Sequence, residues 1–191
     1  MGATWWYTLL TGILIGLCSV VGLLSLFVSL IPRAVIAPIF IFIGFEIMRQ
    51  AYNDSPPAHS PAVSLSILPV IASLVLIILG QFTGALGATP DKLPVRLQIM
   101  HQTLTMLSNG FIITGLLWGS LLAFLIDHKA KLAALCATVC AVLTLFGIIH
   151  SVMPTGELYL PWTVTSHAHY MTATAYFALA VIMFLLTEKN K

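Results

Sequence analysis

Four histidines are the side chains of this sequence best suited to hold a metal ion, because neutral imidazole nitrogens are common metal ligands. They fall near the ends of long apolar runs that we expect to meet on one side of the molecule: His101, His150, His167 and His169. A haem or metal site would need these rings to converge. However, a His-x-His spacing at a helix start points two rings about 200° apart around the helix axis. A small membrane redox or metal protein is therefore the alternative hypothesis, and anchoring of helix ends is the favoured role.

Glu46 and Arg49 are a second pair of side chains that could take part in chemistry, and they lie three residues apart inside an apolar stretch. Ionisable groups at membrane depth are costly and are often functional. At this spacing the two side chains can form an ion pair on one helix face, with the arginine stem reaching toward the lipid headgroups. We favour this interpretation because the pair lies near a helix end. In the alternative, Glu46 is a gating or proton-coupling carboxylate that faces a water-filled interior.

Two amides and two glycine patterns lie inside apolar runs and predict helix packing. Gln102 and Asn109 are expected to be buried and to hydrogen-bond between helices, with contact to a substrate as the lesser alternative. The patterns Gly12-x-x-x-Gly16 and Gly115-x-x-x-Gly119 permit close approach of neighbouring helices, which is how helices associate where the hydrophobic drive is absent.

The cysteines and the known catalytic motifs give no sign of an enzyme. Cys18, Cys136 and Cys140 all fall inside apolar runs, and the last two share one helical face, which suits packing better than a disulfide or a zinc site. The sequence contains no nucleophile elbow, phosphate-binding glycine loop, zinc-protease signature or pair of catalytic carboxylates. We therefore predict neither enzymatic activity nor a cofactor. The net charge of +2, without a basic run, predicts no binding of nucleic acid.

The elements that must position these residues are six apolar runs, which fill almost all of the 191-residue chain. Hydrophobic residues make up 59% of the chain and charged residues 7%, against about a quarter charged in a soluble domain. A bilayer core of about 30 Å needs roughly 20 apolar residues per helix. Lipid offers no partner to backbone polar groups, so each run should be helical. The sequence predicts an all-α membrane protein, a polytopic bundle of about six transmembrane helices in a single domain.

The predicted helices cover residues 5–30, 34–52, 62–82, 97–126, 131–150 and 167–186. With six crossings, both termini share one side with the loops that follow the second and fourth helices. That side carries five lysines and arginines and the other side carries three. Positive charge favours the cytoplasmic side. We therefore place both termini in the cytoplasm and the chain in the cell (inner) membrane, with the lipid bilayer as its first partner.

Several segments resemble one family of membrane transporters. Leu30–Glu46 contains an IP-x-x-V turn that leads into an apolar helix with a glycine, and it resembles the late part of the xanthine/uracil permease (nucleobase–ascorbate transporter) family. The polar loop that follows, Gln50–Val63, is similar to loops of permease-like proteins. Leu107–Ile112 and Gly147–Ser151 look like the extended C-terminal part of the same branch. The resemblance covers most of the chain.

The resemblance implies a secondary transporter in which a core domain moves against a gate domain. It assigns the first three predicted helices mostly to the gate. The family's substrate-binding carboxylates and paired half-helices have no match in this sequence, so the substrate-binding residues stay unassigned and Glu46 does not inherit their role. The leading hypothesis is a gate-side C-terminal part of a nucleobase-type transporter, completed by a complementary permease core domain or by a homo-oligomer. A structural membrane subunit without a ligand is a further hypothesis.

Overall fold

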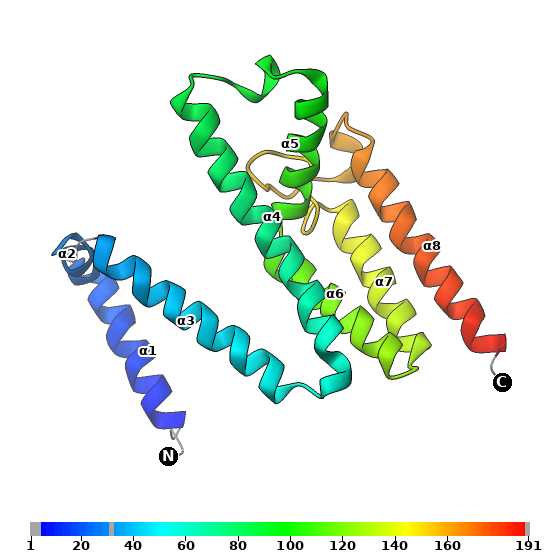
Figure 1. Ribbon diagram of the computed structural model, residues 1–191, viewed down its shortest axis with the longest axis horizontal. Helices are drawn as coiled ribbons and strands as arrows, with labels where there is room; N and C mark the ends of the chain where they lie inside the picture. The colour runs from blue at the N-terminus through cyan, green and yellow to red at the C-terminus, as the bar shows by residue number, and fades with distance from the viewer. Residues whose placement is uncertain (1–4, 31–32, 190–191) are drawn as a thin grey trace. The chain divides into compact units, whose positions relative to one another are not determined.

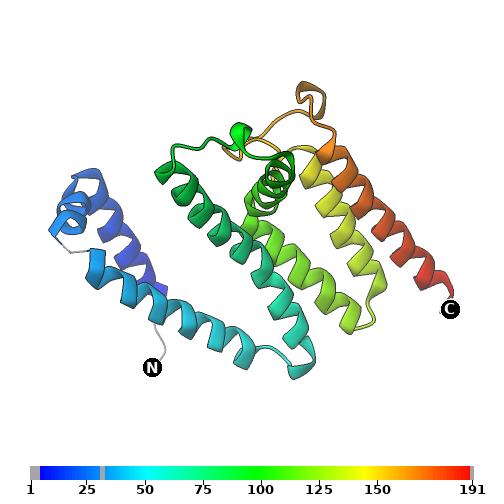
Figure 2. The same cartoon turned by 45° about the horizontal axis from the view of Figure 1, so that its top comes forward.

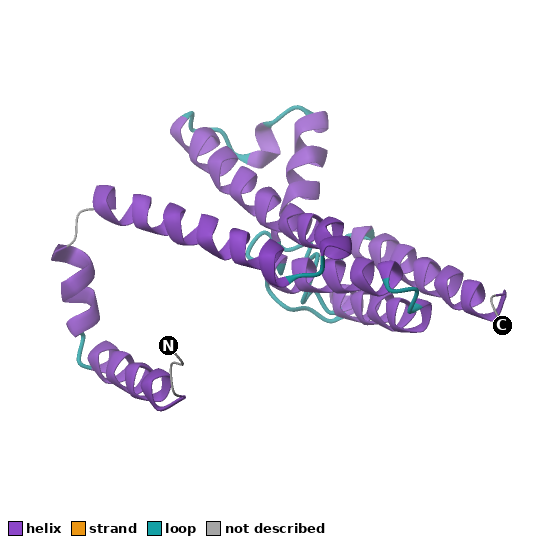
Figure 3. Cartoon of the chain, turned by 60° about the horizontal axis from the view of Figure 1, so that its bottom comes forward, coloured by secondary structure: helices purple, strands orange, loops and turns teal. Residues whose placement is uncertain are grey.

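The computed structural model describes residues 5–30 and 33–189, and every regular element in these ranges is helical (Figure 3). The predicted all-α fold class is therefore confirmed. By their internal contacts, the residues fall into two compact units, residues 1–53 and residues 54–191.

The first unit has three helices in its described part: α1 (Trp5–Val20), α2 (Leu23–Leu30) and α3 (Arg33–Asp54) (Figure 1). The single helix expected over residues 5–30 is wrong, because the chain turns at Val21 and Gly22, where Gly22 has a φ of +80°. A residue in this left-handed conformation ends an α-helix. The expected helix over 34–52 agrees with α3 to within two residues at either end. The expected Ile31-Pro32 turn lies outside the described residues.

The second unit has five helices in its described part: α4 (Ser60–Ala85), α5 (Val95–Ser108), α6 (Phe111–Ile126), α7 (Ala130–Leu145) and α8 (Ala168–Lys189). Short 3-10 turns lie at Pro57–His59, Pro90–Lys92 and Pro161–Thr163. α6 packs between α4 and α7, and α8 packs against the other side of α7 (Figures 1 and 2). α5 packs against α4. The unit is thus a row of helices with α5 added beside α4.

The single helix expected over residues 97–126 is also wrong. It is divided into α5 and α6, which meet at an angle of 76°. The division falls at Asn109 and Gly110, and Gly110 has a φ of +72°. A Cβ atom at this position would lie 2.3 Å from the backbone oxygen of Ile148. Only glycine combines this backbone conformation with so close an approach.

The helix expected over residues 131–150 ends earlier, at Leu145. The following residues are non-helical, and His150 itself has a φ of +53°. Gly147 lies against the ring of Tyr159, where a Cβ atom would be 2.5 Å from the nearest ring carbon. His150 therefore belongs to a loop packed on the ends of the helices, instead of closing a helix as predicted.

Small residues fill the contacts between the helices of the second unit. Ala133, Ala137 and Cys140 on α7 are completely buried. Cys136 is buried beside them and forms no disulfide. A Cβ atom on Gly115 of α6 would lie 2.5 Å from the backbone oxygen of Ser66 on α4. The close helix approach predicted from the second glycine pattern is therefore confirmed. The first pattern, Gly12-x-x-x-Gly16, has no such neighbour within 4 Å among the described residues.

Two helical segments of the described part are long and apolar enough to cross a membrane, Pro57–Ala85 and Ala168–Leu186. The bent pair of α5 and α6 makes a third if it is counted as one span. α1 and α7 are apolar but shorter, with 16 residues each. The outer faces of these helices are rich in exposed large apolar side chains, such as Leu74, Ile112 and Leu116.

Candidate functional site

The bend between α5 and α6 is held by one amide side chain, that of Asn109. Its Nδ2 donates to the carbonyl oxygens of Ser151 and Met153, both at 2.8 Å. Its own backbone oxygen accepts a hydrogen bond from the backbone N–H of His150 at 3.1 Å. Asn109 was expected to bond between helices, and it instead bonds the loop that follows α7. Backbone groups that leave a helix need such partners, because buried unpaired polar groups are costly.

His150 extends this contact inward through a chain of uncharged hydrogen bonds. Its Nδ1 lies 3.2 Å from the carbonyl oxygen of Met106 on α5, and its Nε2 lies 2.8 Å from the hydroxyl of Tyr176 on α8. The indole Nε1 of Trp118 on α6 lies 2.6 Å from the same hydroxyl. The imidazole therefore joins α5 to α8, and Tyr176 joins α8 to α6.

The directions of these bonds determine the protonation of the ring. A carbonyl oxygen only accepts, so Nδ1 of His150 carries the hydrogen that it donates to Met106. An indole N–H only donates, so Tyr176 accepts from Trp118 and has its own hydrogen left to donate to Nε2 of His150. All the polar groups are satisfied when the imidazole is neutral. Burial lowers the pKa of His150, because removal from water disfavours the charged ring.

An open groove of about 350 Å³ leads to His150 between α5 and α8. Besides the imidazole, it is lined by Thr103, Met106 and Leu107 on one side and by Ala168, Met171 and Thr172 on the other. Its lining combines two hydroxyl groups and one imidazole with apolar side chains. The groove and the chain of hydrogen bonds make this region the candidate functional site.

The four histidines do not form a common ligand set. His169 is completely buried and its two ring nitrogens have no hydrogen-bond partner, and its ring packs edge-on against Tyr159 at 5.3 Å between centroids. His167 is exposed, and His101 is half-buried. Within the ranges that the structure describes, no three His, Cys, Asp or Glu side chains lie close enough together to hold a metal ion. The geometry gives no support to the redox or metal alternative.

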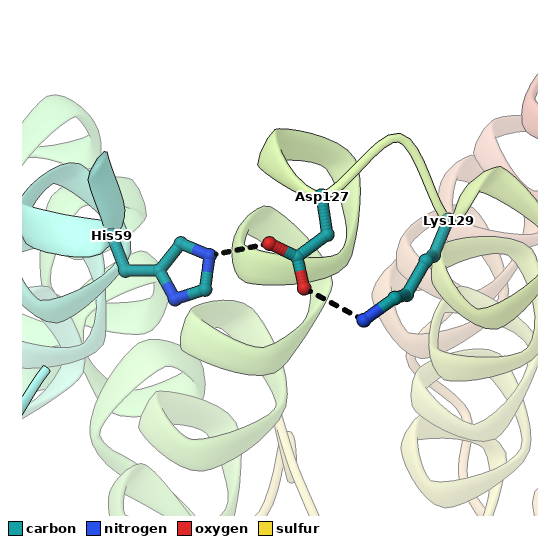
Figure 4. A network of polar contacts seen from close by, with 3 residues as sticks. All are labelled: His59, Asp127 and Lys129. Carbon is teal, nitrogen blue, oxygen red and sulfur yellow. Dashed lines mark hydrogen bonds and ion pairs between the residues drawn. The ribbon is translucent and has the colours of Figure 1, made fainter. Parts of the chain in front are cut away.

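A second polar cluster lies at the opposite end of α6. Asp127 accepts from His59 Nε2 at 2.7 Å and from Lys129 Nζ at 2.9 Å (Figure 4). These contacts join the start of α4 to the turn between α6 and α7. The neighbouring ammonium of Lys129, and then the imidazole of His59, hold the pKa of Asp127 below its ordinary value. Sequence reasoning missed this cluster, because His59 and Asp127 lie 68 residues apart and no motif connects them.

His59 also lines an open groove with a volume of about 590 Å³. This groove runs between α4 and α6, past the small residues Ser66, Gly115 and Gly119. Its lining is mostly apolar. The two ends of α6 thus each carry a polar cluster beside an open groove.

The remaining predicted residues are Glu46, Arg49 and Gln102. Glu46 and Arg49 on α3 form an exposed ion pair, in which Nε of Arg49 lies 2.9 Å from Oε2 of Glu46 and a second contact joins Nη2 to Oε1. The prediction that Gln102 is buried is wrong, because its side chain is exposed on α5. Its apolar neighbours in the sequence suggested a position inside one long apolar helix. The bend at Asn109 instead places Gln102 on the separate helix α5, which does not continue the line of α6.

Comparisons of the chain with protein-family models, with curated proteins and with solved structures find no match.

Proposed function

We propose that this chain is a multi-pass protein of the cell membrane, with about six crossings and both termini in the cytoplasm. The proposal is supported by two segments of spanning length, Pro57–Ala85 and Ala168–Leu186, whose side chains are mostly turned outward. Such large exposed apolar surfaces are typical of proteins surrounded by lipid. The remaining crossings are supplied by α3 and by the short helices α1, α2, α5, α6 and α7, singly or as bent pairs.

Within this class, we propose a gate-side part of a nucleobase-type secondary transporter that requires a complementary core domain. The observation that carries the transporter class is the discontinuous pair of α5 and α6, and the gate-side assignment rests on the resemblance alone. Helices broken at membrane depth are tolerated where protein satisfies the freed backbone, and they recur in secondary transporters. Here Asn109 and His150 provide those partners. The resemblance of Leu30–Glu46 and Leu107–Ile112 to the xanthine/uracil permease family supplies the class of substrate.

The membrane part of the proposal is tested by extraction of cell membranes with alkaline carbonate. An integral protein stays in the pellet and is released only by detergent. Recovery of the folded chain in the carbonate supernatant would contradict the whole proposal, including the orientation.

The transport part is tested by uptake of labelled uracil and xanthine in a host that lacks its own nucleobase uptake. We expect no uptake from this chain alone, and uptake when the product of the adjoining upstream reading frame is co-expressed. Uptake by the purified chain in liposomes would refute the need for a core domain. Absence of uptake from the pair, with both proteins present in the membrane, would favour a structural subunit.

A further inference from the structure

The hydrogen bonds that link α5 to α8 pass through one side chain, that of His150. α5 packs mainly against α4, and α8 packs mainly against α7. Between α5 and α8 lies the open groove lined by Thr103 and Thr172, and His150 is located at its inner wall. The ring bonds to α5 through Met106 and to α8 through Tyr176. Any change that breaks one of these two bonds loosens the join between the helices.

Protonation is such a change, because it converts Nε2 of His150 from a hydrogen-bond acceptor into a donor toward Tyr176. With a proton on Nε2, both ring nitrogens donate. The hydroxyl of Tyr176 must then accept from His150 as well as from Trp118, and its own hydrogen loses its acceptor. A buried donor without a partner is costly. Protonation therefore reverses the hydrogen bond between His150 and Tyr176 and leaves the hydroxyl hydrogen of Tyr176 without an acceptor, which destabilises this contact.

The surroundings offer no anion to compensate a charged ring. The groups that face it are the Met106 carbonyl from α5, the Trp118 indole from α6 and the Tyr176 phenol from α8, with the thiols of Cys136 and Cys140 on α7 beside Tyr176. His101 on α5 and His169 on α8 make no hydrogen bond or ring contact with it. Among the described residues, no carboxylate pairs with His150.

We propose that His150 is a proton-binding site, and that proton uptake by its Nε2 separates α8 from α5 and widens the groove between them. The open groove reaches the ring, although the residue itself is only 4% exposed. The inference concerns the fold alone and holds whether or not the chain transports a nucleobase. Since burial lowers the pKa of His150, the widening should occur below about pH 6.5, the ordinary value for histidine.

The test measures the distance between two spin labels, one on each helix, by pulsed electron resonance. Gln102→Cys on α5 and Thr174→Cys on α8 are suitable positions, because both side chains are exposed and neither lines the groove. The native cysteines are replaced by alanine. We expect the mean distance to lengthen between pH 8 and pH 5 and to return when the pH is restored. An unchanged distance would overturn the proposal.

Two variants and one control show whether His150 is responsible. His150→Asn tolerates the left-handed backbone of this position and should give the same distance at both pH values. Tyr176→Phe removes the hydroxyl, and should give the long distance at both pH values. His167→Gln, at an exposed histidine of the same region, should respond like the parent. A parent-like pH response in monodisperse His150→Asn or in Tyr176→Phe would refute the proposal.

Discussion

At one end of α6, Asp127 joins His59 and Lys129 through exposed ionic contacts. At the other end, Asn109, His150 and Tyr176 are joined by partly buried, uncharged hydrogen bonds. The ionic contacts tolerate changes in geometry, and water and salt screen them. The uncharged bonds depend on the direction of every hydrogen, and a lost partner leaves a buried group unpaired. We therefore expect stability to be concentrated at the uncharged end and sensitivity to salt at the charged end.

The largest effect should come from filling the space at the bend. Gly110→Ala places a Cβ atom 2.3 Å from the Ile148 oxygen and forces a left-handed conformation on alanine. We expect a loss of about 3 kcal/mol in the free energy of unfolding, from backbone strain and overpacking together. Thermal unfolding in detergent measures it. Gly80→Ala on α4 is the matched control, since nothing lies within 4 Å of that position, and it should be neutral or stabilising. Equal effects of the two substitutions would remove the special role of the bend.

A smaller loss should follow removal of the amide at the bend. Asn109→Ala leaves the carbonyl oxygens of Ser151 and Met153 without their donor, which should cost about 2 kcal/mol. Gln102→Ala, at an exposed amide about two helix turns earlier, should change stability by less than about 0.5 kcal/mol. The same unfolding measurement compares them. If the two alanine variants unfold alike, the uncharged end does not hold the loop.

The smallest effect should come from the charged end. Asp127→Asn keeps the shape of the side chain and removes its charge, and we expect a slight fall in unfolding temperature that disappears in high salt. The pKa of Asp127 is lowered in the folded protein, so its contribution is complete above the unfolded value of about 3.9 and is lost as the pH falls through the folded pKa.

The pH dependence separates the two ends. The pKa of His150 is lowered as well, but a histidine with a lowered pKa contributes stability at high pH and loses it as the pH falls below about 6.5. Between about pH 6.5 and pH 4.5 the uncharged end should therefore weaken while Asp127 stays ionised. Unfolding curves across this range, for the parent and for Asp127→Asn, should fall in parallel. A fall confined to the parent would assign the pH dependence to the charged end instead.

Much of the helical architecture follows from the distribution of apolar residues, because prolines, glycines and charges interrupt the runs where helices end. The expected helix over 167–186 corresponds to α8, and the one over 62–82 to α4, with differences of a few residues at the ends. The break at Asn109-Gly110 was missed because the apolar character continues on both sides of it. An Asn-Gly pair is nevertheless a turn signal, and it is visible in the sequence.

The candidate site was predictable only in part. His150 and Asn109 stood out as polar residues within apolar surroundings, but their connection required the fold of the loop after α7. Nothing in the sequence marks Trp118 and Tyr176 as members of the site, because aromatic residues are frequent in apolar helices. Their hydrogen-bond partners become visible only in the fold. The link between His59 and Asp127 depends on the antiparallel packing of α4 and α6, which no local pattern encodes.

For the membrane protein proposed above, the unequal lengths of neighbouring helices have a consequence for the surrounding lipid. α7 has 16 residues and rises about 24 Å, whereas its neighbour α8 has 22 residues and rises about 33 Å. Leu132, Leu135 and Val142 of α7 are exposed, so α7 presents an apolar face to its surroundings. Because α7 and α8 differ in length, no single hydrocarbon thickness matches both helices. Either the lipid layer beside α7 is thinner, or α8 tilts from the membrane normal. The tilt of α8 should accordingly depend on the length of the lipid acyl chains.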